Sequence, residues 1–440
     1  MNDKVSKYNI EVEHTECMLL YNALTDMLLP ISFKEYAAIE TLLEHLPEFS
    51  NKFPNLYASF KQSGFIINAN FDELAYIKLQ NKKRVYAHSD YHITINPTLD
   101  CNLKCWYCSV GYAGAQHNKE RMSDETVAAL NKHIENLILG QKAHSVLLSW
   151  FGGEPMMYYD EVINKVSKFS QAIASEHNTH FQQQITTNAT LLNEERIKQM
   201  RDFNFAFFQI PIDGNERKHN LVKRFSDKQG TYRKVIDNIN LIANIIPNVT
   251  INVRVNYDKQ TLKNIQDIAA DFSEKSKSCI SIDFQRVWQI PVTDNERGLL
   301  QSAKEYFREA GFRSNFWAYR PRTFRCCYAD SFYHYVINYN GKVFKCTARD
   351  YSEDQELGRL QPSGKIVWND ELVSIFYEKA GFENETCENC NMLPLCMGPC
   401  IQKTYERRIK NQPLQCLYQN VEYSLSNYII DVAKRRNLIQ

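Results

Sequence analysis

Residues 91–108 read YHITINPTLDCNLKCWYC. The opening run YHITINPT (91–98) is rich in β-branched residues and predicts a strand. Directly after it stand Cys101, Cys105 and Cys108, in the spacing C-x3-C-x2-C. Three thiolates suit an iron–sulfur cluster that leaves one iron without a protein ligand, whereas a structural zinc site uses four ligands. The stretch therefore predicts a cluster with an open iron at the end of a strand.

An iron without a protein ligand is open to small molecules. The amino and carboxylate groups of S-adenosylmethionine can chelate this iron. The cluster then passes an electron to the bound S-adenosylmethionine, which releases a radical that removes hydrogen from unactivated carbon. The protein positions the reactants. Two other interpretations of the spacing are one face of a helix and a zinc site completed by His92 or His117. The position after a strand, with GGEP after the next strand, favours the cluster.

The sequence around this loop alternates between β-rich runs and amphipathic stretches. The runs are 91–98, 145–151, 181–187, 205–212, 249–256 and 279–287, with helical patterns near 123–139, 158–176, 192–203, 231–245 and 260–275. Six strands separated by helices predict parallel βαβ units, and so a barrel or part of one. In such folds the chemistry lies where strands end, and here the cysteines, GGEP, TTNAT and PIDG each follow a run.

CNLKCWYC, followed by WFGGEP (150–155), resembles the radical S-adenosylmethionine (radical SAM) superfamily. The resemblance implies an α/β fold with a partial (β/α)6 barrel. TTNAT is similar to the TNG element of the superfamily's peptide-modifying branch, although Ala189 replaces the usual glycine. Glycine permits close approach of the backbone to the cofactor's amino group. By this resemblance the cofactor-binding residues include Gly152, Gly153, Glu154, Thr187 and Asn188.

Residues 211–224, PIDGNERKHNLVKR, resemble the DG…H(D/N)xxR element of the same branch. The resemblance makes Asp213 and Arg224 candidates for holding the ribose or carboxylate end of the cofactor. Strict spacing from His219 falls on Lys223 rather than on Arg224. The alternative for both candidates is an ordinary turn or a surface salt bridge.

The chain has thirteen cysteines, which favour metal ligation over disulfides in a cytoplasmic protein because its thiols stay reduced. Cys17 and Cys279 stand alone and suit small apolar fillers. The C-terminal part contains Cys327, Cys346, Cys387, Cys390, Cys396, Cys400 and Cys416 in order. Seven thiols exceed the needs of one zinc ion and suggest two clusters, with a paired zinc ribbon as the alternative.

This order resembles the SPASM extension of radical SAM enzymes. By the resemblance, the inner auxiliary cluster is held by Cys327, Cys346 and Cys400, and the outer one by Cys387, Cys390, Cys396 and Cys416. Cys326 is a fourth inner ligand, a free thiol, or a sign that an inner iron stays open. Sulfatase-maturing relatives carry an Asp base directly after the second cysteine, where this chain has Thr347. The remaining catalytic candidates are Asp330, Asp350 and Cys326, although a surface role suits each aspartate better.

The fragment 16–79 resembles the PqqD-like, winged-helix leader-recognition elements of peptide maturases. Such elements add an extended leader peptide to a sheet edge and raise the effective concentration of the core peptide. A structural cap on the barrel is the alternative. The expected domains are a small N-terminal domain (1–88), the radical SAM partial barrel (89–290), a connector (291–325) and the cysteine-rich SPASM domain (326–440).

Composition limits the partners. A net charge of +1 and 23% charged residues give no basis for binding nucleic acid or an anionic membrane. No apolar run reaches the ~18 residues that span a bilayer, and the start MNDKVSKYN lacks the apolar core of a secretory signal, which favours the cytoplasm. The expected partners are a precursor peptide with its leader and a flavodoxin- or ferredoxin-type electron donor.

These observations predict a radical SAM oxidoreductase that uses S-adenosylmethionine and three 4Fe–4S clusters, one in the barrel and two auxiliary. Its expected substrate is a ribosomally made precursor peptide, in which it forms a carbon–carbon or thioether crosslink. One alternative is a maturase that oxidises or epimerises a residue. The other is a zinc-stabilised peptide-binding module without catalysis.

Overall fold

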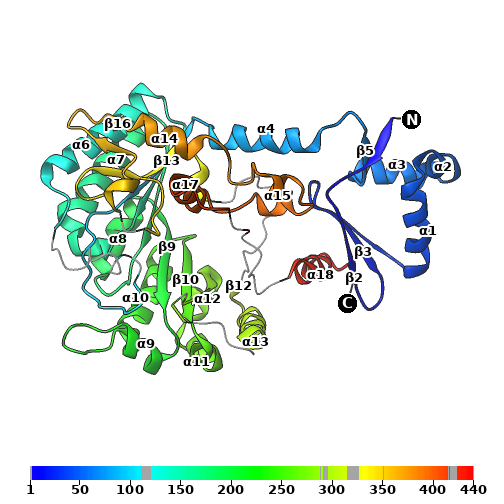
Figure 1. The fold of residues 1–440 in the computed structure, drawn as a ribbon. Helices are drawn as coiled ribbons and strands as arrows, with labels where there is room; N and C mark the ends of the chain where they lie inside the picture. The colour runs from blue at the N-terminus through cyan, green and yellow to red at the C-terminus, as the bar shows by residue number, and fades with distance from the viewer. Residues whose placement is uncertain are drawn as a thin grey trace. The chain divides into compact units, whose positions relative to one another are not determined.

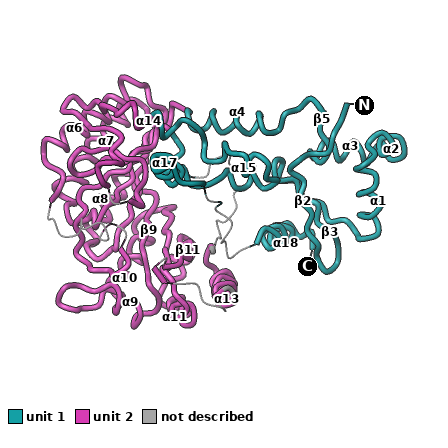
Figure 2. The backbone as a smooth tube through the Cα atoms, in the orientation of Figure 1, with its two compact units in different colours: residues 1–86, 317–331, 374–440 teal, residues 87–316, 332–373 magenta. Residues whose placement is uncertain are grey.

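The computed structural model describes residues 2–108, 110, 120–287, 289–290, 296–314, 327–349, 351–414, 416 and 424–439. Cys326, Asp350 and His117 lie outside these residues, so their predicted roles stay predictions. The chain divides into two compact units (Figure 2). The first comprises Met1–Tyr86, Trp317–Ser331 and Ser374–Gln440, and the second comprises Ala87–Phe316 and Phe332–Val373.

The second unit is built on a large, mostly parallel sheet with helices between its strands (Figure 1). Its six central strands pair in parallel in chain order: β6 (Asp90–Ile95), β7 (Ser145–Trp150), β8 (His180–Thr186), β9 (Phe205–Ile212), β10 (Thr250–Tyr257) and β11 (Ile280–Arg286). The helices of this unit are α6 (Asp124–Glu135), α7 (Asn164–Glu176), α8 (Glu194–Asp202), α9 (Glu216–Val222), α10 (Tyr232–Ile245), α11 (Lys259–Lys263), α12 (Glu274–Cys279) and α13 (Glu296–Glu309). The predicted α/β alternation is confirmed.

The sheet continues beyond β6 and β11 without closing on itself. On one side β13 (His334–Ile337) pairs in parallel with β6, and β14 (Lys342–Phe344), β15 (Gly358–Leu360) and β16 (Ile366–Trp368) follow antiparallel. On the other side the short strand β12 (Arg313–Ser314) pairs with β11. Residues far along the chain therefore complete the sheet that carries the three-cysteine loop.

The strands alternate between an apolar and a polar face. Val253 and Val255 of β10 are fully buried in the core that the sheet forms with its helices. Since successive side chains point to opposite faces, Asn252, Arg254 and Asn256 lie on the other face. The neighbouring strands repeat this pattern, with His92, Ser149, Gln184, Gln209, Asp283 and Gln285 on that same face. The inner face of the open barrel is therefore polar.

The first unit contains both ends of the chain. Its N-terminal part has β1 (Asp3–Val5) paired with β5 (Ile66–Asn68), and an antiparallel sheet of β2 (Asn9–Glu13), β3 (Met18–Asn22) and β4 (Met27–Ile31). Its helices are α1 (Phe33–Glu44), α2 (Leu46–Lys52), α3 (Pro54–Ser63), α4 (Glu73–Val85), α15 (Glu385–Glu388), α16 (Leu393–Cys396), α17 (Ile401–Ile409) and α18 (Leu425–Arg435), while α14 (Asp370–Tyr377) crosses the division.

The C-terminal helix shares a core with the N-terminal sheet. Ile429 and Val432 of α18 pack in one apolar cluster with Tyr8 and Tyr21, and the rings of Tyr21 and Tyr428 meet edge to face at 6.5 Å. The first unit is thus held together by residues from opposite ends of the sequence. Across the described residues, none of the helices is both long enough and apolar enough to span a bilayer.

Candidate functional site

The three-cysteine loop follows the carboxyl end of β6. The Cys101 sulfur accepts hydrogen bonds from the backbone N–H of Leu103 (3.4 Å) and from Asn188 Nδ2 (3.8 Å). Burial raises the pKa of the Cys101 thiol to about 12, with further contributions from Glu154, Cys105 and Cys108. The three thiols therefore lie close enough to affect one another's charge. Thiolates brought together in this way repel, and a bound metal cluster offsets that repulsion.

Gly152 and Gly153 bring the end of β7 against this loop. The backbone N–H of Gly153 donates to Thr98 O (3.1 Å), and that of Glu154 donates to Asp100 O (2.8 Å). A β-carbon would lie 2.2 Å from Thr98 O at position 152 and 2.0 Å from Asp100 O at position 153. Only glycine fits at such distances from backbone atoms. The two glycines thus support the cysteine loop directly, a role that sequence reasoning missed.

Glu154 joins β7 to the turn after β8. Its buried carboxylate accepts hydrogen bonds from Thr187 Oγ1 (2.7 Å), from the backbone N–H of Asn188 (2.7 Å) and from that of Met156 (3.1 Å). Burial raises the pKa of Glu154 to about 7, while these hydrogen bonds act to lower it. Ala189 has a φ of 61°, in the left-handed region, so the turn keeps the conformation that the usual glycine would favour. The structure thus brings Glu154, Thr187 and Asn188 together.

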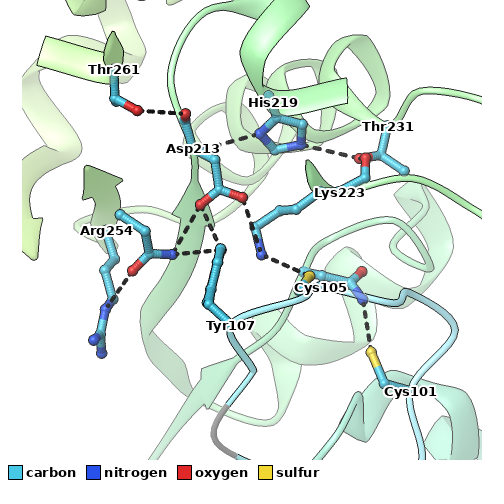
Figure 3. A network of polar contacts seen from close by, with 11 residues as sticks. Cys101, Cys105, Tyr107, Asp213, His219, Lys223, Thr231, Arg254 and Thr261 are labelled. Atoms are coloured by element: carbon cyan, nitrogen blue, oxygen red, sulfur yellow. Dashed lines mark hydrogen bonds and ion pairs between the residues drawn. The ribbon is translucent and has the colours of Figure 1, made fainter. Parts of the chain in front are cut away.

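A buried polar network connects the loop to the ends of β9 and β10 (Figure 3). Asp213 Oδ1 accepts hydrogen bonds from Tyr107 Oη (2.6 Å) and from Asn256 Nδ2 (3.1 Å), and Asp213 Oδ2 lies 3.7 Å from Lys223 Nζ. Lys223 Nζ donates to the sulfur of Cys105 at 3.4 Å and lies 5.4 Å from the centre of the Tyr107 ring. Asp213 therefore faces the cysteine loop through Tyr107 and Lys223.

Lys223 is buried, and its neighbours keep it in the charged form. Burial acts to lower the pKa of Lys223, but the neighbouring Asp213 and Cys105 hold that pKa well above its usual value. Arg224, the cofactor-binding candidate from the sequence, is exposed, and its backbone bridges to Gly230. The buried cation is thus the residue that strict spacing from His219 indicated.

Four C-terminal cysteines lie near one another within the first unit. Burial raises the pKa of the Cys396 thiol to about 12, and the thiols of Cys387, Cys416 and Cys390 raise it further. Burial is also the largest cause of the raised pKa of the Cys387 thiol, and the thiols of Cys416 and Cys390 raise that pKa further. These are the residues that the sequence assigned to the outer auxiliary cluster.

The predicted inner-cluster residues are divided between the units. Cys327 and Cys400 belong to the first unit and Cys346 to the second, where its sulfur accepts the backbone N–H of Ala348 at 3.4 Å. The surface role expected for Asp330 is wrong, because Asp330 is buried and its carboxylate accepts the backbone N–H of Cys327 at 2.7 Å. Over the described residues, no three His, Cys, Asp or Glu side chains are arranged to hold a single metal ion.

Residues 95–272 match the radical SAM superfamily. The cysteine-type anaerobic sulfatase-maturating enzyme of Clostridium novyi (strain NT) is 24% identical over 335 residues, which cover 68% of this chain and 85% of that protein. The PqqA peptide cyclase of Bradyrhizobium diazoefficiens is 23% identical over 328 residues, covering 70% and 80%.

Two solved structures share the fold. Native anSMEcpe with bound AdoMet has a TM-score of 0.56 at 19% identity, covering 79% of this chain and 98% of that one. Streptococcus suis SuiB bound to precursor peptide SuiA has a TM-score of 0.54 at 15% identity, covering 95% and 99%. The predicted radical SAM domain and α/β fold class are confirmed. The superfamily implies a 4Fe–4S cluster and S-adenosylmethionine, and the N–H donors aimed at the Cys101 and Cys105 sulfurs fit such a cluster.

Proposed function

We propose that this chain, which contains a radical SAM domain, modifies a ribosomally made precursor peptide and forms a carbon–carbon or thioether crosslink in it. The observation that carries the proposal is that Glu154 reaches the Cys101 sulfur through Asn188, and the Asp213–Lys223 pair reaches the Cys105 sulfur, at the ends of neighbouring parallel strands. PqqA peptide cyclase is named for its peptide, and SuiB has been solved with the precursor peptide SuiA. Both support a peptide substrate.

In this proposal Cys101, Cys105 and Cys108 hold the 4Fe–4S cluster. When bound, the cluster and S-adenosylmethionine supply a radical that removes a hydrogen atom from the substrate. Gly152 and Gly153 keep the loop against the end of β7, and Glu154 fixes the Thr187–Asn188 turn beside it. The polar inner face of the sheet then receives the peptide segment that is modified.

Two auxiliary clusters complete the proposal. Cys387, Cys390, Cys396 and Cys416 are the ligands we assign to the outer one, because their thiols interact within one unit. Cys327, Cys346 and Cys400 are assigned to the inner one, with Cys326 as the candidate fourth ligand. Bond formation after loss of a hydrogen atom leaves one surplus electron, which an auxiliary cluster can accept. An electron donor of the flavodoxin or ferredoxin type would reduce the first cluster.

Residues 1–88 are proposed to bind the leader of the precursor. The order β2-β3-β4 leaves β2 and β4 as the outer strands of their sheet in the described part of the chain. An outer strand presents backbone groups to which an extended peptide can add as a further strand. Removing residues 1–85 is expected to weaken binding of the leader peptide, and unchanged affinity would contradict this role.

The test of the function is anaerobic reconstitution followed by co-expression with a candidate precursor. The proposal expects a brown protein with about twelve irons per chain, which cleaves S-adenosylmethionine after reduction. The precursor is sought in a small open reading frame beside this one, and a crosslink reduces its mass by two hydrogens. A colourless protein loaded with zinc contradicts the proposal, and a modified peptide of unchanged mass identifies epimerisation instead.

A further inference from the structure

Lys223 is the one buried ammonium group that contacts a cysteine of the loop in the described part of the chain. Its side chain is 6% exposed, and Nζ lies 3.4 Å from Cys105 Sγ, which is hydrogen-bond distance for a sulfur acceptor. The distance to Asp213 Oδ2 is longer, at 3.7 Å, and does not make a hydrogen bond. The ammonium therefore makes a hydrogen bond to the sulfur, while the carboxylate acts as a more distant counter-charge (Figure 3).

Three structural features fix the ammonium in this position. Lys223 follows the last turn of α9, and its backbone N–H donates to His219 O at 2.7 Å. Its carbonyl accepts a hydrogen bond from Thr231 Oγ1 at 2.7 Å. The face of the Tyr107 ring lies beneath Nζ, and the Tyr107 hydroxyl is itself held by Asp213. A lysine fixed on both sides of its backbone and packed on an aromatic ring has few other positions for its charge.

A cation beside a ligand sulfur changes the energetics of an iron–sulfur cluster. Reduction adds one negative charge, and a nearby ammonium in a low-dielectric site favours the more negative state. Hydrogen bonds to the sulfurs are among the features that set cluster potentials. Both effects make a cluster easier to reduce.

We propose that Lys223 is a positioning residue that raises the reduction potential of the cluster held by Cys101, Cys105 and Cys108 through its N–H···S contact with Cys105. The inference rests on the proposed function, because it requires that cluster. It assigns to Lys223 an effect on electron entry, whereas the sequence pattern indicated only a contact with S-adenosylmethionine at this element.

The test is a redox titration of the reconstituted full-length protein, in which electron paramagnetic resonance monitors the reduced clusters. The signal of interest is the one that S-adenosylmethionine alters, since in the proposed function the cofactor binds at the cluster of Cys101, Cys105 and Cys108. K223M is expected to make reduction at least about tenfold less favourable, which is a shift of about 59 mV to more negative potential for one electron. K223R, which retains a cation and N–H donors, is expected to shift less.

Lys218 supplies a matched control. It lies on α9, and its Nζ pairs with Asp258 Oδ2 at 2.7 Å. K218M removes the same charge from the chain but no contact with the cysteines, so it is expected to leave the potential unchanged. Equal shifts in K218M and K223M would show a general charge effect and overturn the inference.

Removing Lys223 alone leaves the buried Asp213 without its counter-charge and can impair folding. The double variant D213N/K223M avoids this, because it retains neither buried charge. Its potential is expected to lie below that of the unmodified protein, because Lys223 is the member of the pair that contacts Cys105, and an equal potential overturns the inference. A protein that binds no cluster contradicts the proposed function instead, whereas one that cleaves S-adenosylmethionine with an unchanged potential contradicts only the role of Lys223.

Discussion

At the end of α9, the position of a residue in the turn determines whether its side chain is buried or exposed. Lys223 and Arg224 are adjacent cations at the end of α9, yet Lys223 is buried beside Cys105 and Arg224 is exposed. A side chain one position further along a chain points in a different direction, so a motif with an offset of one residue changes which charge enters the site. The sequence pattern located the element correctly, and the three-dimensional course of α9 decided which cation it uses.

His219 gives a prediction for acid stability. Burial lowers the pKa of this imidazole to about 4, and its Nδ1 accepts the backbone N–H of Asp213 at 3.4 Å. Between pH 6.5, where His ionises when unfolded, and about pH 4, the unfolded chain binds a proton that the folded chain does not, so stability falls as the pH falls through this window. His219→Gln, which does not titrate, is expected to show a flatter loss of melting temperature over that range.

The control for this experiment is His177→Gln. His177 is exposed at the end of α7, so its replacement is expected to leave the pH dependence of the melting temperature as it is in the unmodified protein. Parallel curves for the His219 variant and the unmodified protein would show that His219 does not contribute to acid sensitivity.

At the scale of elements, the junction between β7 and the cysteine loop is the tightest contact near the site. Gly153→Ala would place a β-carbon 2.0 Å from a backbone oxygen of Asp100, which can move only with the loop itself. Overpacking of this kind costs about 1–3 kcal/mol. The variant is expected to melt at a lower temperature and to incorporate less iron, as measured by thermal unfolding and iron analysis.

Gly140→Ala is the matched glycine control, since a β-carbon there would meet no atom within 4 Å. Its melting temperature and iron content are expected to equal those of the unmodified protein. Normal iron content in Gly153→Ala would mean that the loop tolerates displacement.

Arg254 of β10 gives a second prediction at this scale. On the polar inner face, its Nε donates to Asn256 Oδ1 at 3.2 Å, and within the described residues it forms no ion pair. Its remaining donors suit a carboxylate of the proposed peptide substrate. Arg254→Gln is expected to retain cleavage of S-adenosylmethionine without peptide and to lower peptide modification about tenfold, measured by chromatography and mass spectrometry.

Lys is the conservative replacement at this position, and Arg254→Lys is expected to restore part of the peptide activity because it keeps the charge. An equal loss of S-adenosylmethionine cleavage and peptide modification in Arg254→Gln would show that the arginine serves the cofactor rather than the substrate.

At the scale of the whole molecule, the two ends of the chain share one core. Ile429 of α18 is fully buried in the cluster that includes Tyr8 and Tyr21. Ile429→Ala is expected to lower the free energy of unfolding by about 2–5 kcal/mol. Hydrogen exchange is expected to accelerate in β2 and β3, although the substitution lies near the opposite end of the sequence.

Leu438→Ala provides the comparison, because Leu438 is 38% exposed and its truncation leaves little buried surface. Exchange in β2 and β3 is expected to match the unmodified protein. If Ile429→Ala accelerated exchange only within α18, the shared core would not stabilise the N-terminal sheet.

The sequence alone determined the parts of this protein that depend on local spacing. The alternation of β-rich runs and amphipathic stretches predicted the strands β6 to β11, because the two elements bury side chains at different periods along the chain. The spacing of Cys101, Cys105 and Cys108 after the first strand predicted the radical SAM domain, since all three ligands of this cluster lie within one short loop.

Tertiary structure alone decided how distant segments meet. It added β13, from the cysteine-rich part of the chain, to β6 through the pairing of His334 with His92, and it packed α18 on the N-terminal sheet. It also directed Lys223 toward Cys105. Each of these contacts joins residues more than a hundred positions apart. The periodicity of a segment shows which of its faces is buried, but not which distant segment packs against that face.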